Sequence, residues 1–230
     1  ALFLPEGMNP VTSWGSGGLA SVWAEENTRE SIFDALQRKE TYATSGPRIK
    51  VRFFAGHNFS EQQFEGKNAI VHAYAHGVAM GSELKPTSGS ESPGFYLMAW
   101  KDPNGANLDR AQIVKGWVDD TGVSHEKVFD VAVADQRIAN PSTAKFPDVG
   151  NTVDPSTPSY TNTIGGPSIL AFWKDPEFQS DQSAFYYVRV LEIPTPRWST
   201  FDAVKLGTVP MEPATIQERA ITSSIWYRAY

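Results

Sequence analysis

The chain has 230 residues, a formal net charge of −6 at pH 7 and no cysteine. Its 13 Phe, 8 Tyr and 7 Trp, within an apolar content of 40%, exclude a disordered protein and are enough to bury a core. The acidic balance argues against a nucleic-acid binder, and the absence of cysteine excludes disulfides, thiolate metal sites and a cysteine nucleophile.

The first predicted element is a helix that begins near residue 27 and ends near residue 39. Asn27 and Glu30 have the spacing of a capping box, in which each side chain satisfies a backbone amide of the first turn. Ile32, Phe33 and Leu36 recur at helical spacing, so we expect one apolar face.

After this helix the sequence consists of short alternating or apolar runs separated by turn residues. We predict strands at residues 41–44, 49–54, 68–74, 95–100, 108–114, 127–134, 168–173, 184–193 and 224–227. Residues 139–168 are rich in turn formers and predict a long irregular loop, whereas residues 212–220 predict a short helix.

This pattern favours a mainly β fold, an antiparallel β-sandwich preceded by a short α/β segment with one helix. The Gly46-Pro47 turn suggests a boundary between residues 1–49 and a sandwich at residues 50–230. No apolar run reaches the length of a membrane span.

A carboxylate pair stands immediately before the predicted helix. Glu25 and Glu26 could act in acid–base chemistry or ligate a metal, with Asn27 beside them. Carboxylates at a helix N-terminus also stabilise the helix dipole, so a purely structural role fits the same residues.

A second candidate group follows the helix. Arg48, after the turn at Ser45, could bind an anion with its guanidinium fork, or form an ordinary surface ion pair at the start of a strand. Trp23 and Tyr42 flank these positions and could form the wall of a pocket, although aromatic residues more often belong to a core. Together, these two groups are the candidate substrate-binding residues.

His72 and His76 are four residues apart, a spacing that brings two imidazoles together for zinc only on a helix. Their neighbours favour a strand, on which residues four apart are too distant to chelate one ion. We therefore interpret both as polar surface histidines and assign no metal ligand in this chain.

Four tryptophans support a different hypothesis, that of a carbohydrate- or ligand-binding module. They are Trp100, Trp117, Trp173 and Trp198. Two or more of them exposed on one face would favour a sugar-binding platform, whereas burial would indicate packing inside the sandwich.

One long segment resembles a known family. The stretch AEENTRESIFDALQRKETYATSGPRIKVRFFAG at residues 24–56 is similar to the domain-of-unknown-function family 3604 (DUF3604), which in turn is similar to carbaryl-hydrolase-like metallohydrolases of the polymerase-and-histidinol-phosphatase (PHP) superfamily. The resemblance continues through residues 77–81, 109–117, 186–190 and 222–227, and so covers most of the chain.

The resemblance implies that this chain is the C-terminal part of a longer bacterial protein, with residues 1–49 as the end of a PHP-like α/β barrel. The intact protein would then be a hydrolase that cleaves a phosphate, sulfate or carbamate ester with a divalent metal. This chain would carry no catalytic residue and no cofactor. Its expected partners are the N-terminal barrel portion or a partner chain, and a small-molecule substrate. The compartment, periplasm or cytoplasm, stays open.

Overall fold

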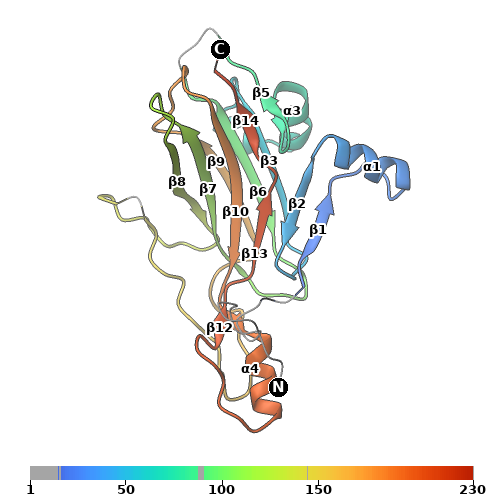
Figure 1. Ribbon diagram of the computed structural model, residues 1–230, viewed down its shortest axis with the longest axis vertical. Helices are drawn as coiled ribbons and strands as arrows, with labels where there is room; N and C mark the ends of the chain where they lie inside the picture. The colour runs from blue at the N-terminus through green and yellow to red at the C-terminus, as the bar shows by residue number, and fades with distance from the viewer. Residues whose placement is uncertain (1–14, 16, 88–90, 144, 230) are drawn as a thin grey trace.

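The protein folds as two β-sheets packed face to face, with helices at the periphery (Figure 1). The computed structural model describes residue 15 and residues 17–87, 91–143 and 145–229. Strands account for 37% and helices for 14%, so the prediction of a mainly β fold with antiparallel sheets is confirmed.

The larger sheet is centred on β10, which pairs with β7 on one side and with β13 and β14 on the other. Its strands are β1 (Leu19–Val22), β2 (Thr41–Thr44), β5 (Glu83–Leu84), β7 (Leu108–Val118), β8 (Ser124–Val133), β10 (Ala184–Glu192), β13 (Arg219–Thr222) and β14 (Ile225–Tyr227). The described pairs in this sheet are antiparallel, except that β14 runs parallel to β5.

The smaller sheet is antiparallel and has the order β4-β3-β6-β9. Its strands are β3 (Lys50–Gly56), β4 (Val78–Ala79), β6 (Gly94–Trp100) and β9 (Ser168–Lys174). A separate ribbon joins β11 (Thr195–Pro196) to β12 (Thr215–Ile216).

The main core fills the space between the two sheets. Phe95 of β6 contacts Phe53 of the neighbouring β3, with ring centroids 5.7 Å apart, and Tyr186 of β10 across the interface, with ring centroids 4.7 Å apart. Burial alternates residue by residue along β10, because successive side chains on a strand point to opposite faces. The inward residues of both sheets therefore form one apolar layer, as in a β-sandwich.

The helices occupy different places around the sheets. They are α1 (Arg29–Gln37), α2 (Glu61–Phe64), α3 (Ala69–His76) and α4 (Trp198–Lys205). Figure 1 shows α1 projecting to one side and α4 lying beyond the end of the sheets with β12. A second apolar cluster, in which Ala73 meets Phe54 and Tyr96, packs α3 on the outer face of the smaller sheet. None of the described helices combines the length and apolarity needed to cross a membrane.

The helix α1 forms where the sequence predicts one, but its cap differs. Thr28, not Asn27, is the N-cap, and its Oγ1 accepts a hydrogen bond from the Ser31 amide at 3.3 Å. The expected apolar face is largely uncovered, because Phe33 is 57% exposed and Leu36 52% exposed.

The predicted strand at residues 68–74 is wrong, because this segment is the helix α3. The β-branched Ile70 and Val71 favour a strand by composition. However, Ala69 and Ala73 stand one helical turn apart and form the buried face, where small side chains allow the helix to approach the sheet closely. Tertiary packing therefore decides the conformation against local propensity.

The predicted helix at residues 212–220 is also wrong. Pro213 interrupts this segment, which instead contains β12 and the start of β13. The helix in this region is α4, which follows the extended residues Thr195–Pro196 and which the sequence does not predict.

The other predicted strands are present, and residues 139–168 are largely irregular as expected. At Gly46-Pro47 the chain passes from the larger sheet to the smaller one. Because β2 pairs with β13, residues 41–44 share a sheet with the C-terminal strands. The division into a barrel remnant and a sandwich stays a prediction.

Candidate functional site

A pocket of about 670 Å³ opens where the segment between β1 and α1 meets β3, α3 and β4. It contains two of the residues singled out from the sequence, Trp23 and Glu25. Its lining also includes Arg38, Glu40, Arg52, Tyr74, Val78 and Ser82. Aromatic, cationic and acidic side chains therefore meet around one opening.

The centre of this pocket is a stacked arginine. The Arg52 guanidinium carbon lies 3.6 Å from the centroid of the Trp23 ring, which is a close cation–π contact. Trp23 is itself held by its indole N–H, which donates to the Val51 carbonyl at 2.7 Å. On the other side, Arg52 Nη1 donates to the Tyr74 hydroxyl at 2.8 Å. Neighbouring elements thus hold the guanidinium in one orientation.

Glu40 holds Tyr74 and Arg38 in place at this pocket. It is only 4% exposed, and its carboxylate accepts a hydrogen bond from the Tyr74 hydroxyl. Arg38 Nη2 lies 3.6 Å from the second carboxylate oxygen of Glu40. Burial, followed by the hydrogen bond to Glu40, raises the pKa of Tyr74 to about 12, so Tyr74 stays a neutral donor at physiological pH.

The remaining N–H groups of Arg52 define what this pocket can bind. A guanidinium carries five N–H donors, and among the described residues Arg52 uses one of them, toward Tyr74. An anion can take two parallel hydrogen bonds from such a fork, and the adjoining Trp23 ring offers an apolar surface. The geometry suits a small anion attached to an apolar or aromatic group.

The other sequence-predicted residues divide between two places. Tyr42 lies next to the pocket, with its ring centroid 6.3 Å from that of Trp23, and burial raises its pKa. Glu26 and Asn27 are exposed ahead of α1, where the Glu26 amide donates to Ser31 Oγ at 3.3 Å.

Ser45 and Arg48 lie at the opposite end of β2, away from the pocket. The Ser45 hydroxyl donates to the Glu218 carboxylate, and the Arg48 amide donates to Asp102 Oδ2 at 2.8 Å. Backbone hydrogen bonds from Arg48 and Asn104 lower the pKa of Asp102. The structure therefore does not bring these two residues together with Trp23 and Glu25.

Sequence reasoning missed the residues that hold the pocket together. Arg52 stands in an alternating strand, where an outward arginine is ordinary, and Tyr74 falls in the segment predicted as a strand. Glu40 carries no local signal of burial, since it follows Lys39 in the short turn between α1 and β2. The usable signal was Arg52 itself, an arginine on the strand β3 that faces Trp23 in the folded protein.

The two histidines of α3 share a face of the helix, with ring centroids 4.5 Å apart. The argument that a strand would hold the two imidazoles too far apart to bind one metal ion therefore does not apply, because the segment is a helix. A metal site would still need further ligands. Within the part of the chain that the structure describes, no group of three or more His, Cys, Asp or Glu side chains is placed to hold a metal.

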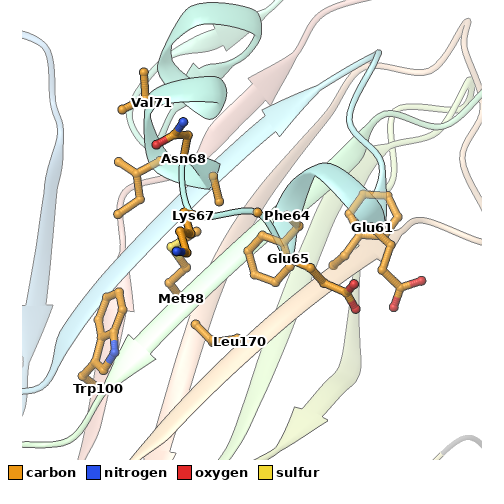
Figure 2. Close-up of a pocket in the computed structure, with 13 residues that line it drawn as sticks. Glu61, Phe64, Glu65, Lys67, Asn68, Val71, Met98, Trp100 and Leu170 are labelled. Atoms are coloured by element: carbon orange, nitrogen blue, oxygen red, sulfur yellow. The ribbon is translucent and has the colours of Figure 1, made fainter.

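The four tryptophans considered as a sugar platform do not share a face. Trp117 and Trp173 pack against the core between the sheets. Trp198 belongs to α4, and Trp100 lines a separate pocket of about 480 Å³ on the outer face of the smaller sheet. Figure 2 shows this pocket, in which Trp100, Met98, Leu170 and Phe64 lie below the connection to α3.

The architecture is that of a β-sandwich protein with an arginine-centred pocket at one edge. A comparison with protein families places the chain more closely: the family described as "Protein of unknown function (DUF3604)" matches residues 6–229. The chain therefore belongs to the DUF3604 family. Comparisons with curated proteins and with solved structures gave no match. The similarity to PHP-superfamily enzymes remains a prediction.

Proposed function

We propose that this chain is the sandwich portion of a DUF3604 protein that hydrolyses an ester with a divalent metal. Its role is to bind the anionic part of a small-molecule substrate. The observation that supports this role is the Arg52 guanidinium, fixed between the Trp23 ring and the Tyr74 hydroxyl inside the pocket. A preorganised cation binds an anion with little loss of side-chain entropy.

The metal would come from outside this chain. The described residues offer no set of three ligands, so they fit a metal centre poorly and we assign this chain no chemical step. Phosphate, sulfate and carbamate esters share an anionic or strongly polar head group, which is the feature that Arg52 recognises.

The uncovered face of α1 supports the second part of the proposal, that a preceding barrel portion packs against the N-terminal region. Phe33 and Leu36 are more than half exposed on a helix that projects from the sheets (Figure 1). Docking would cover these side chains and would place the barrel beside the pocket that Trp23 and Glu25 line.

Binding of phenyl phosphate to the purified chain tests the role of Arg52. We expect Arg52→Gln to weaken binding by roughly 10- to 100-fold, because charge-assisted hydrogen bonds contribute about 1.5–3 kcal/mol. Arg52→Lys should lie between the two, since it keeps the charge and loses the stacked fork. Titration calorimetry measures the affinities, with inorganic phosphate and sulfate as probes that lack the aromatic group.

Arg29→Gln is the matched control, because Arg29 is an exposed arginine at the start of α1, outside the pocket lining. It should leave the affinity unchanged. Equal affinities of the Arg52→Gln variant and the original chain would refute the assignment, as would a failure of the original chain to bind phenyl phosphate.

A further inference from the structure

A further recess, of about 640 Å³, lies at one end of the larger sheet and shares no lining residue with the Arg52 pocket. Its lining comes from β7, β8, β10 and β14. Ala184 and Tyr186 on β10, like Ile225 and Tyr227 on β14, belong to the core. The residues between them, Phe185 and Trp226, therefore point to the outer face of the sheet.

The floor of the recess is aromatic. Phe185 and Trp226 are direct partners across β10 and β14, with ring centroids 5.2 Å apart and planes inclined by 48°. Gly116 is the β7 partner of Phe185, and a Cβ there would lie 2.2 Å from the Phe185 ring. The absence of a side chain at Gly116 thus lets the Phe185 ring lie over the β7 backbone, and Trp226 rises beside it with 47% exposure.

Polar groups border this floor on two sides. On β8, Glu126 is paired with Gly116 and Ser124 is paired with Val118, and both polar side chains are exposed. On the other side, Arg228 follows β14, and its Nε lies 3.3 Å from the Glu83 carboxylate. A ligand resting on the two rings would have a carboxylate and a hydroxyl on one side and a guanidinium on the other.

We infer that this recess, the Trp226 recess, binds a saccharide. A pyranose ring has an apolar C–H face, which packs on aromatic rings, and a rim of hydroxyls, which hydrogen-bond to carboxylates and guanidinium groups. The Phe185 and Trp226 rings, inclined by 48°, together offer an apolar surface on which such a ring can stack. A purely apolar ligand would instead leave unused the polar border that Glu126 and Arg228 form beside the rings.

Tryptophan fluorescence and titration calorimetry on the purified chain test this inference. The probes are tetrasaccharides of cellulose, xylan, laminarin, chitin, amylose and polygalacturonate, each at up to about 10 mM, where even weak binding is detectable. We expect at least one to bind. Trp226→Ala should then weaken its binding by ~10-fold or more, because the main stacking surface is lost.

Two variants make the outcome specific. Glu126→Gln lies at an exposed position, so its folding is not in question, and it should weaken the same saccharide by ~3- to 10-fold through the loss of a charge-assisted hydrogen bond. Trp198→Ala removes another partly exposed tryptophan, on α4, and should leave binding unchanged. Failure of every probe to bind would overturn the inference. Binding that survives both Trp226→Ala and Glu126→Gln would overturn it as well, as would preferential binding of a nucleoside.

Discussion

Replacing Lys115 with alanine should lower the free energy of unfolding by about 3–5 kcal/mol, because it leaves a buried carboxylate without its counter-charge. Lys115 points inward from β7, and its Nζ lies 2.6 Å from Asp175 Oδ2, just beyond the end of β9. The two side chains are 3% and 0% exposed. Their ion pair therefore links the larger sheet to the smaller one inside the sandwich.

Both members of this ion pair make further hydrogen bonds. Lys115 Nζ also donates to the Glu177 carbonyl at 2.8 Å, and the Tyr186 hydroxyl donates to Asp175 Oδ2 at 2.8 Å. Burial raises the pKa of Tyr186, and the Asp175 charge raises it further, so Tyr186 remains a donor. Without Lys115, the Asp175 carboxylate would keep the hydrogen bond from Tyr186 but would lose its cation.

Equilibrium unfolding in urea measures the loss, and a double variant tests its cause. Lys115→Ala alone should be strongly destabilising, whereas adding Asp175→Asn should recover part of that loss. The amide removes the buried charge and can still accept from Tyr186. If the second substitution instead adds its own full penalty, the destabilisation does not come from an uncompensated charge.

Much of the sheet architecture can be predicted from the sequence, because alternation along a strand is a local property. The run at residues 184–193 alternates so regularly that its strand follows from composition and period alone, and β10 confirms it. The helix α3 cannot be predicted in this way, because its conformation depends on Ala69 and Ala73 packing on a sheet formed by other segments.

The pocket was harder to predict than the fold, for the same reason. Trp23 and Glu25 line the same pocket and are close in sequence, whereas Arg52 and Tyr74 reach them through tertiary packing. Nothing local distinguishes Arg52 from the other charged residues of its strand. Its position in the sequence groups Ser45 with the pocket residues, although β2 separates it from them in space.

The stability of the protein should fall as the pH rises from about 5 to about 9, owing to Glu192 at the end of β10. Glu192 is 2% exposed, and its Oε1 is buried without a hydrogen-bond partner among the residues that the structure describes. Burial, followed by the negative charges of Glu218 and Asp102, raises the pKa of Glu192 to about 8, although Lys101 acts in the opposite direction. The folded protein therefore keeps a proton that the unfolded chain releases near its ordinary value of 4.5.

The direction of the effect follows from proton counting. Between these two pKa values the folded state binds more protons than the unfolded state, so each increase in pH favours unfolding. The stability that the folded protein gains by keeping the Glu192 proton is fully present below about pH 4.5 and is lost as the pH rises past about 8. We expect a total loss of roughly 2–5 kcal/mol from this one group, at about 1.4 kcal/mol per unit of pKa difference.

Glu192→Gln removes the titrating group and keeps its shape, so it isolates this contribution. Urea unfolding at pH 5 should give similar stabilities for the variant and the original chain, because Glu192 is then mostly protonated in the fold. At pH 9 the variant should be more stable by roughly 2–5 kcal/mol, since it has no buried charge to accommodate. Glu65→Gln, at an exposed carboxylate beside α2, should leave the pH dependence unchanged. If the stability difference between the Glu192→Gln variant and the original chain is the same at both pH values, Glu192 does not titrate between them, and its burial must be compensated by a partner close to its carboxylate.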